Sequence, residues 1–578
     1  MDKQHKILIA NRGEIAVRVI QACKDLNIPS IAVYADDDID SLHVQYADEA
    51  WALSGVTAKE TYLNIPRLIE IAQNAQATMI HPGYGFLSER AEFAQAVLDA
   101  GLIWIGPSPE SIEKLGDKIE ARKIAASVGA PLVHGTAQPL NNAQEALEFA
   151  QTYGLPMAIK AAFGGGGRGL KVAWQLEEVE ALYESAVREA ITAFGRGECF
   201  VEQYLDKPRH LEAQIIADQH GHVVVVGTRD CSLQRRNQKL VEEAPAPFID
   251  EHIHQQILSS STNICRAAQY VGAGTVEYLL SRDGKLSFLE VNTRLQVEHP
   301  VTEMTSGIDL VCEQIQIALG RPLSIQETPQ PQGHAIEFRI NAEDPARGFI
   351  PAFGRIKKFT APFGLGVRLD TGVLSGSLVS SHFDSLMAKL IVYGPTREIA
   401  LQRARRALAT FEIEGVASVL PFHRAVLTQP DFTENFQVHT RWIEQDFQHN
   451  FDVAPRSSLS SQSGVQHFML EIDGKLHRVG LPVGVFSGFA AQSQPSRESL
   501  VEQNSSPNDV IAPINGVITT WKVAEGAQVA KGEVIAIMEA MKMEIQVMAH
   551  QAGTLQHLAQ TGKTLKADEK IAEIIAAS

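Results

Sequence analysis

The chain has 578 residues, 45% of them hydrophobic, which is enough apolar material for several folded domains. Its formal net charge of −17 excludes the broad basic surface that a nucleic-acid-binding protein needs. No apolar run approaches the roughly 20 residues that span a bilayer, the start has neither a signal segment nor a transit peptide, and the five cysteines form no CxxC pair, so we expect a cytoplasmic protein.

Residues 1–115 alternate short apolar segments with helical ones. The segment KILIA precedes a helix that begins near Glu14, and IPSIAVY, TMIHPGYG and LIWIGP follow as further strands. This alternation predicts a doubly wound α/β unit.

Residues 116–200 begin with a helix and continue as PMAIKAAFGGGGRGLKVAW, which reads as strand, glycine loop, strand. Backbone N–H groups in such a loop can approach phosphate oxygens without obstruction by Cβ atoms. Lys160 before the loop and Lys118 further upstream could also hold a phosphate. The loop is not a Walker A motif, because no Gly-Lys-Ser/Thr follows. The alternative is a flexible surface turn.

The segment GTVEYLLSRDGKLSFLEVNTR reads as a hairpin centred on Asp283-Gly284. With a two-residue turn there, Glu277 lies opposite Glu290, and Asn292 lies on the same face, opposite Thr275. Facing carboxylates repel each other, and a hard divalent cation relieves that repulsion. Two carboxylates and a carboxamide therefore favour Mg²⁺ (or Mn²⁺) holding a polyphosphate. The alternative is a solvated charged face.

The next residues, Asn292 to His299, place an arginine and an acid close together. Arg294 can clamp a small planar oxyanion with two hydrogen bonds, and Glu298 can act as a general base beside it. The alternative is that arginines among carboxylates form structural ion pairs. Further basic groups that could join the site are Arg235, Arg236, Lys239 and Arg339.

Residues 334–445 show short strands and a helix near REIALQRARRALATF, and the residue composition changes after about Asn450. LEIDGKLHRV predicts a small hairpin with Asp473-Gly474 as its turn. The stretch from Ser487 to Asp509 is polar and low in hydrophobic residues, as is typical of a flexible linker. Its roughly 25–28 Å mean reach would let a tethered domain visit two sites.

The last 70 residues contain a weak repeat, because residues 526–533 resemble residues 562–569. Two similar β halves packed face to face would form a small flattened barrel. EAMKMEIQV falls between them, which places Lys542 at the connecting turn without the usual turn residues. The alternative for these nine residues is an amphipathic helix.

Several of these stretches together resemble the biotin carboxylase family, which has the ATP-grasp fold. The matching motifs are NRGEIA, HPGYGFLSE, KAAFGGGGRG, RDCSLQRRNQK, EVNTRLQVEHPVTE and EFRINAEDP, and EAMKMEIQ resembles the attachment motif of biotin carboxyl carrier domains. The arrangement is similar to the biotin-containing α subunits of acyl-CoA carboxylases.

The resemblance implies an α/β (α+β) multidomain chain in six parts. They are a Rossmann-like N-terminal domain (1–115), an ATP-grasp domain (116–330) with a glycine-loop lid (about 131–204), a C-terminal carboxylase domain (331–447), a small β segment (448–486), a flexible linker (487–509) and an all-β biotinyl domain (510–578).

The resemblance also implies a role for each candidate residue. Glu298 would deprotonate bicarbonate, Arg339 would stabilise the biotin enolate, and Lys542 would carry the covalent biotin. The implied ATP-binding residues are Lys118, Lys160, Gly165, Gly166, Glu202, Leu205, His210, Gln234, Glu277 and Glu290. The implied metal ligands are Glu277, Glu290 and Asn292. The implied bicarbonate ligands are Lys239, Arg294, Gln296, Val297 (through its backbone) and Glu298, and the catalytic set is Glu298, Arg294, Arg339 and Lys239.

Two positions depart from the family pattern: Asn237 stands where many members have His, and Gln203 where some have Lys. Both concern nucleotide contacts. Residues 448–507 are too few for a carboxyltransferase, so the implied partners are a separate carboxyltransferase (β) subunit and a biotin protein ligase, with the chain as a homo-oligomer inside a hetero-oligomer. Three alternatives stay open: a non-CoA acceptor such as urea, an ATP-grasp ligase with a lipoyl-type carrier, and a non-catalytic scaffold.

Overall fold

The structure is a computed structural model. It describes residues 5–136, 138–161, 170–194, 196–452, 465–472, 475–482, 508–513, 516–540, 543–565 and 569–575. The Asp473-Gly474 turn and nearly all of the expected linker lie outside these residues. Among the described residues, no helix combines the length and apolar content needed to cross a membrane.

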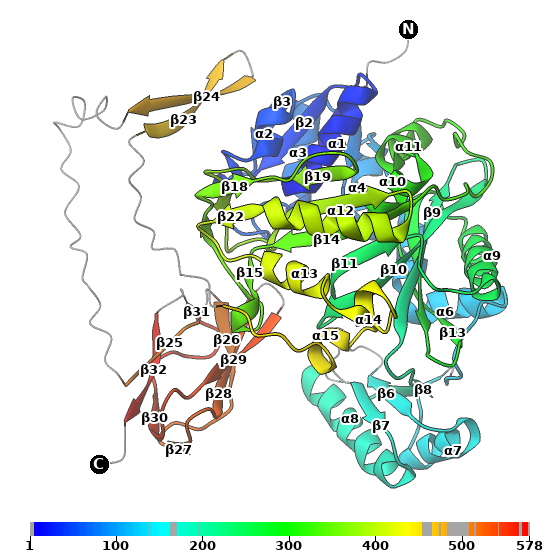
Figure 1. Cartoon of the computed structure of the whole chain (residues 1–578), viewed down its shortest axis with the longest axis vertical. Helices are drawn as coiled ribbons and strands as arrows, with labels where there is room; N and C mark the ends of the chain where they lie inside the picture. The colour runs from blue at the N-terminus through cyan, green and yellow to red at the C-terminus, as the bar shows by residue number, and fades with distance from the viewer. Residues whose placement is uncertain are drawn as a thin grey trace.

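The N-terminal part is a five-stranded parallel sheet with the strand order β3-β2-β1-β4-β5 (Figure 1). The strands predicted at KILIA, IPSIAVY, TMIHPGYG and LIWIGP are all present. The strands are β1 (Ile7–Ile9), β2 (Ser30–Tyr34), β3 (Glu49–Ala52), β4 (Met79–His81) and β5 (Ile103–Trp104). The helices are α1 (Gly13–Asp25), α2 (Leu42–Tyr46), α3 (Ile65–Asn74), α4 (Ala91–Asp99) and α5 (Pro109–Gly116).

Asn11 joins the NRGEIA and HPGYGFLSE segments at the ends of β1 and β4. Its Nδ2 donates to the backbone oxygens of Pro82 (2.7 Å) and Tyr84 (2.8 Å). Gly83, with φ of +63°, lies so close that a Cβ atom would fall 2.8 Å from that Nδ2. The two segments therefore form one fixed loop pair at the carboxyl edge of the sheet.

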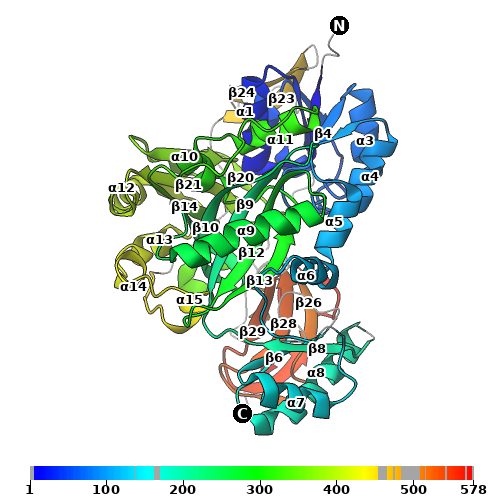
Figure 2. The same ribbon diagram turned by 90° about the vertical axis from the view of Figure 1, so that its right-hand side faces the viewer.

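A small three-stranded sheet, β7-β6-β8, projects at the end of the molecule opposite the N-terminal sheet (Figures 1 and 2). The strands on either side of the glycine loop pair with each other as predicted, Ile159 opposite Lys171. Its elements, with the helix before it, are α6 (Lys118–Ser127), α7 (Ala143–Tyr153), β6 (Met157–Ala161), β7 (Leu170–Ala173), α8 (Val179–Phe194) and β8 (Cys199–Gln203).

The centre of the molecule is an eight-stranded sheet with the order β13-β12-β9-β10-β11-β14-β21-β19. It runs without a break across residue 330, where two domains were expected to meet, because β11 and β14 pair through Val241 and Phe338. Helix α9 crosses one part of the sheet in Figure 2, and α12, predicted from its sequence, packs on β21 and β14. The strands and helices of this part are β9 (Arg209–Ala217), β10 (Val223–Arg235), β11 (Gln238–Ala244), α9 (Glu251–Ala267), β12 (Gly272–Leu280), β13 (Leu286–Asn292), α10 (His299–Ser306), α11 (Leu310–Ala318), β14 (His334–Asn341), β19 (Val367–Thr371), β21 (Leu386–Gly394) and α12 (Arg397–Thr410).

The two-residue turn predicted at Asp283-Gly284 is wrong. Leu280 pairs with Leu286, and Ser281 closes a longer loop because its N–H donates to the Lys285 oxygen and its Oγ accepts from the Lys285 N–H, each at 2.9 Å. A bulge at Leu289 then adds one residue to β13 and restores the predicted register, with Glu277 opposite Glu290.

Short elements complete the part of the chain from residue 343 to residue 445. They are β15 (Glu343–Asp344), β16 (Ile350–Pro351), β17 (Gly354–Arg355), β18 (Lys358–Thr360), β20 (Leu378–Val379), β22 (Glu412–Glu414), α13 (Leu420–Val426), α14 (Pro430–Thr433) and α15 (Trp442–Gln445). The predicted hairpin follows as β23 (Val465–Ile472) paired with β24 (Lys475–Pro482).

The C-terminal unit consists of two four-stranded sheets, β25-β32-β30-β27 and β29-β28-β26-β31. Val529 and Leu565, at equivalent positions of the repeat, lie on β27 and β31 of opposite sheets, and both are buried in the shared core. The strands are β25 (Asp509–Ile511), β26 (Gly516–Trp521), β27 (Gln528–Val529), β28 (Val534–Ala540), β29 (Met543–Met548), β30 (Gly553–His557), β31 (Thr564–Leu565) and β32 (Lys570–Ile575).

Candidate active site

One row of the central sheet carries three acids and an arginine. Glu290 of β13 pairs with Glu277 of β12, Glu277 pairs with Glu212 of β9, and Glu212 pairs with Arg229 of β10. Residues opposite one another in register project to the same face of a sheet. The carboxylates therefore converge because of the register, and they need cations nearby to remain charged.

Lys239 of β11 supplies the central cation. Its Nζ lies 2.7 Å from Glu212, 3.0 Å from Glu277 and 2.6 Å from Glu298. Burial disfavours the ammonium, but the surrounding acidic groups outweigh burial and raise the pKa of Lys239 well above its usual value. The sequence located Lys239 but gave no sign of Glu212, which lies two residues after His210 on the same face of β9.

Glu298 is fully buried at the start of α10 and lies between two cations. Its Oε1 accepts from Lys239, and its Oε2 accepts from Arg339 of β14 at 2.9 Å. Burial opposes its charge, yet Lys239, Arg339 and Arg229 together hold the pKa of Glu298 well below its usual value. Glu298 is therefore a carboxylate, ready to accept a proton once an incoming anion shares its cations.

Arg294 stands beside this centre with its donors already arranged. Its Nε donates to Glu89 (2.9 Å), and its Nη1 donates to the Gln296 side chain (3.0 Å). Glu89 also accepts from the Thr293 N–H at 3.2 Å. Glu89 belongs to the HPGYGFLSE segment, so the N-terminal loop pair holds the arginine in place. The sequence interpretation did not predict that Glu89 orients Arg294. The position of Glu89 in the HPGYGFLSE motif was the signal that could have indicated it.

Val297 contacts a residue that no motif indicated. Its backbone oxygen accepts a hydrogen bond of 2.9 Å from Lys389 of β21, whose ammonium is fully buried. The described segment from Asn292 to Glu298 is thus held from three sides: by Glu89, by Lys239 with Arg339, and by Lys389.

The predicted metal ligands lie at the far edge of the sheet from Arg339. Glu277 and Glu290 face each other in register, and Asn292 is one register position of the same face away. The buried Nδ2 of Asn292 has no hydrogen-bond partner among the described residues, while its Oδ1 accepts a long hydrogen bond (3.4 Å) from Arg294. Two carboxylates and an amide oxygen match the donor preference of Mg²⁺ or Mn²⁺. His210 also faces this group, with Nε2 3.0 Å from Glu277, and that carboxylate outweighs burial and raises the pKa of His210.

The predicted nucleotide residues divide into two groups. Lys118 lies 3.3 Å from Glu290, and Gln234 contacts His210 Nδ1 at 3.4 Å, so these four residues belong to the metal end of the site. At the β7-β6-β8 sheet, Lys160 pairs with Glu202, which also lies 3.6 Å from Arg122, and Leu205 is half-buried just after β8. Gly165 and Gly166 lie outside the described residues.

The two positions that depart from the family pattern have structural roles of their own. Gln203 Nε2 donates to the Tyr153 oxygen at 2.6 Å and so ties β8 to the end of α7. Asn237 and Arg236 both have positive φ, +63° and +48°, and form the turn between β10 and β11. Asn adopts this conformation more readily than most residues.

Lys542 lies outside the described residues, but the strands on either side of it are described. They pair antiparallel, with Glu539 opposite Glu544 and Ala540 opposite Met543, which excludes the helical alternative for these flanks. Ile545 is buried but is not part of the core cluster of the C-terminal unit, and it packs against Ile350 of β16 instead.

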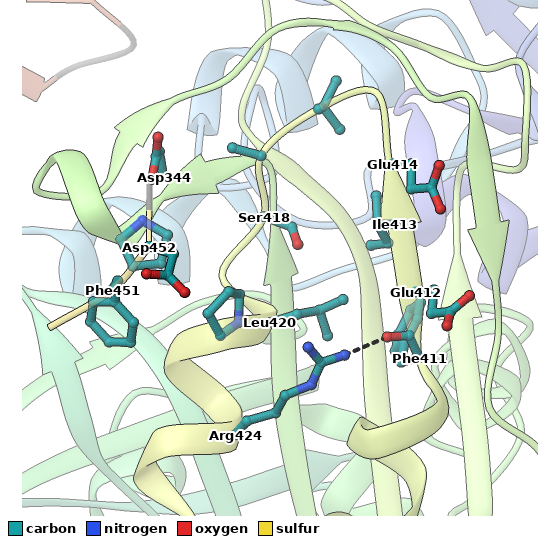
Figure 3. A pocket seen from close by; sticks show the side chains of 14 residues that line it. Asp344, Phe411, Glu412, Ile413, Glu414, Ser418, Leu420, Arg424, Phe451 and Asp452 are labelled. Carbon is teal, nitrogen blue, oxygen red and sulfur yellow. Dashed lines mark hydrogen bonds between the residues drawn. The ribbon is translucent and has the colours of Figure 1, made fainter. Parts of the chain in front are cut away.

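A cavity of about 310 Å³ lies elsewhere, between α13 and β22 (Figure 3). Arg424, Ser418 and Phe451 are among its lining residues, and none of the predicted site residues is among them. The candidate site is therefore defined by converging charges and not by this cavity.

Comparison with known proteins agrees with this geometry. Four family models match: biotin carboxylase, N-terminal domain (residues 3–112), carbamoyl-phosphate synthase L chain, ATP binding domain (117–326), biotin carboxylase C-terminal domain (337–445) and biotin-requiring enzyme (508–574). The biotin-dependent acyl-coenzyme A carboxylase alpha3 subunit of Mycobacterium leprae is 54% identical, over 98% of each chain. Biotin carboxylase of a Nostoc species is 45% identical, over 77% of this chain and 99% of that one.

Solved structures are similar over the carboxylase part. A biotin carboxylase from Campylobacter jejuni in complex with a β,γ-ATP compound has a TM-score of 0.71 and 40% identity, and covers 76% of this chain and 98% of that chain. The biotin carboxylase domain of a Hydrogenobacter thermophilus 2-oxoglutarate carboxylase, with ADP, magnesium and bicarbonate, has the same TM-score, 42% identity and coverage of 76% and 97%. The chain belongs to the family of biotin-dependent acyl-CoA carboxylase α subunits, in which an ATP-grasp biotin carboxylase and a biotinyl carrier domain share one polypeptide and serve a carboxyltransferase partner.

Proposed function

We propose that this chain uses ATP and bicarbonate to carboxylate biotin on its own Lys542, and that a separate carboxyltransferase subunit passes the carboxyl group to an acyl-CoA. The observation that carries the proposal is the buried carboxylate Glu298. It lies between Lys239 and Arg339, and Lys239 also contacts Glu277, one of a pair of carboxylates suited to a metal ion.

Bicarbonate fits between the cations that now hold Glu298. Arg294, Lys239, the Gln296 side chain and the Val297 N–H would bind its oxygens. A bound anion shares the charge of Lys239, and this makes Glu298 more basic at the moment when a proton must be removed. Glu298 then takes the proton of bicarbonate, and the resulting oxyanion attacks the γ-phosphorus of ATP, which gives carboxyphosphate and ADP.

Glu277, Glu290 and Asn292 would hold Mg²⁺ or Mn²⁺, and the metal ion neutralises the phosphates when it is bound. His210, Gln234, Lys118, Lys160 and the loop that contains Gly165 and Gly166 would bind the phosphates, and Glu202 and Leu205 would lie at the adenine. ATP would have to replace two pairs seen here, Lys118 with Glu290 and Lys160 with Glu202.

Biotin supplies a mobile ureido nitrogen that accepts the carboxyl group. Arg339 would stabilise the negative charge that develops there, because its guanidinium is half-buried next to Glu298. The contact of Ile545 with Ile350 supports delivery within the chain, since Ile350 lies only eleven residues after Arg339 and Ile545 three residues after Lys542.

The domain boundaries expected from the sequence, a biotin protein ligase as the modifying enzyme, and a homo-oligomeric state within the hetero-oligomer are part of this proposal. An acyl-CoA acceptor is favoured because the M. leprae relative matches over nearly the whole chain. Urea or another non-CoA acceptor is the second candidate, since the acceptor binds to the partner.

The test uses the biotinylated full chain and its Lys542→Arg variant. The wild type should incorporate labelled bicarbonate in the presence of ATP, and its intact mass should show biotin rather than lipoyl. Lys542→Arg should lose incorporation and keep ATP cleavage stimulated by free biotin. The partner, once captured, is assayed with a panel of acyl-CoA esters and with urea. A wild type that cleaves no ATP with bicarbonate and free biotin refutes the proposal and leaves the scaffold alternative.

A further inference from the structure

Lys389 is a fully buried cation that the chemistry proposed above does not use. It lies on β21, where it is the register partner of Arg339 on β14 and of Asp370 on β19. Its Nζ donates to the Val297 oxygen at 2.9 Å. The cation therefore contacts the peptide group that directly precedes the proposed base, Glu298.

Two acids from different parts of the chain face this ammonium. Glu14 of α1 lies 3.3 Å away, and Asp370 lies 3.9 Å away while Arg368 holds it with two hydrogen bonds of 2.8 Å. Both oxygens of Glu14 are buried and, at hydrogen-bond geometry, have no other partner among the described residues. Lys389 is thus the cation that Glu14 faces, and it connects helix α1 to the active-site segment.

A buried ammonium is a costly way to satisfy one backbone oxygen, because charged groups lose their hydration on burial. A planar peptide unit, however, transmits the constraint: when the Val297 carbonyl is fixed, the orientation of the Glu298 N–H and Cα is fixed with it. The proposed bicarbonate donor, the Val297 N–H, belongs to the preceding peptide unit, which is joined to this one through the Val297 Cα. A charged donor holds this unit more firmly than a neutral one.

The geometry points to Lys389 as a positioning residue for the bicarbonate site: its ammonium, which Glu14 faces, fixes the Val297–Glu298 peptide, and thereby aims the base Glu298 and limits rotation of the neighbouring peptide that carries the Val297 N–H. This inference rests on the proposed role of Glu298. It also assigns a role to the NRGEIA segment, since Glu14, its acidic residue, faces the Lys389 ammonium. Loss of the ammonium should impair bicarbonate use far more than nucleotide binding.

The test compares the full-length wild type with Lys389→Met, Lys389→Arg and Glu14→Gln, and uses Lys358→Met as the matched control. Lys358 is an exposed lysine of the same C-terminal part that pairs with Glu412 and Glu414. ATP cleavage is measured with free biotin while bicarbonate and ATP are varied separately. Melting temperature and nucleotide binding report whether each variant is folded.

In Lys389→Met, we expect KM for bicarbonate to rise at least about 10-fold and kcat to fall at least about 10-fold, with KM for ATP within about 2-fold of the wild type. Lys389→Arg should recover most of the loss, and Glu14→Gln should show a smaller rise in the same KM. The control should match the wild type.

A folded Lys389→Met enzyme with an unchanged KM for bicarbonate overturns the inference, as does an equal rise in both KM values. If Lys389→Met does not fold, Glu14→Gln decides: a selective effect on bicarbonate supports the role, and no effect overturns it. A wild type without bicarbonate-dependent ATP cleavage would instead be a failure of the proposed function.

Discussion

Glu277 and Glu290 are register partners across β12 and β13, and different cations neutralise their two carboxylates. Lys239 and His210 hold Glu277, whereas the cation that pairs with the half-exposed Glu290 among the described residues is Lys118, at 3.3 Å. Glu277 is thereby tied to the centre of the site. Glu290 is the member of the pair that is available to an incoming metal ion.

Glu290→Gln should raise the Mg²⁺ concentration that supports half-maximal ATP cleavage by at least about 10-fold, because one of two carboxylate ligands is lost. The measurement is a Mg²⁺ titration at saturating ATP and free biotin. Glu110→Gln, which removes a carboxylate paired with Lys114 on the surface, is the control and should titrate like the wild type.

Glu298→Gln should lower kcat for bicarbonate-dependent ATP cleavage by about 10²–10⁴-fold, the range typical of a lost general base. The amide cannot take a proton, although it keeps the shape of the side chain. ATP binding, measured by calorimetry, should change little because Glu298 lies at the Arg339 side of Lys239. Activity within threefold of the wild type would assign the base to another group.

Glu89→Gln should raise KM for bicarbonate about 10-fold and leave KM for ATP nearly unchanged. Glu89 holds Arg294 by a charge-assisted hydrogen bond of 2.9 Å and accepts from the Thr293 N–H, so its loss frees the arginine to move. Glu92→Gln is the matched control, since Glu92 lies three residues away and pairs with Arg90 on the surface. Equal effects of both substitutions would contradict the role.

Ile545→Glu should slow labelling of the chain's own biotin by at least about 10-fold and leave ATP cleavage with free biotin unchanged. A charge at this position cannot be buried against Ile350. Met548→Glu is the control, because Met548 is exposed on the same strand. Both variants must first be shown to be fully biotinylated by intact mass. Unchanged self-labelling in Ile545→Glu would exclude this contact from carrier delivery.

Glu243→Gln should destabilise the carboxylase part at neutral pH. Burial opposes the charge of Glu243, but Arg397 (2.7 Å) and His334 (2.6 Å) outweigh it and lower the pKa of Glu243 to about 2. A lowered acid pKa stabilises the fold above the unfolded value near 4.5, and this contribution, about 3 kcal/mol, is lost as the pH falls from 4.5 toward 2.

The difference in melting temperature between wild type and Glu243→Gln should therefore be large at pH 7 and shrink below about pH 4.5. Glu412→Gln, which removes an exposed carboxylate paired with Lys358, should change the melting temperature little at any pH. A constant difference across this pH range would show that Glu243 titrates normally.

The sequence was sufficient to predict the alternation of strands and helices, the facing pair Glu277 and Glu290, and the paired strands around the carrier lysine, because each depends on local periodicity. Its one wrong turn shows the limit of counting residues. The loop after Ser281 is one residue longer than predicted, and the bulge at Leu289 shifts the pairing back by one residue. Glu277 therefore lies opposite Glu290 as predicted, although the predicted turn was wrong.

Contacts between distant segments could not be predicted from spacing. Glu212, Glu89 and Lys389 approach the site from β9, from the loop before α4 and from β21. Glu89 belongs to the HPGYGFLSE motif, but no spacing in the sequence pairs it with Arg294, and none pairs Glu212 with Lys239 or Lys389 with Val297. Their roles depend on how strands of the central sheet pair, which is a property of the whole chain.

The unbroken sheet from β13 to β19 has a consequence for how the enzyme can move. Glu290, at the nucleotide end, and Arg339, at the biotin end, are linked by strand pairing at every step between β13 and β14. Their separation therefore cannot change without breaking backbone hydrogen bonds of the core. The β7-β6-β8 sheet projects away from the central eight-stranded sheet (Figure 1). On the proposed mechanism, opening and closing during turnover would thus belong to parts attached to the central sheet, while the distance between the proposed nucleotide and biotin ends would stay constant.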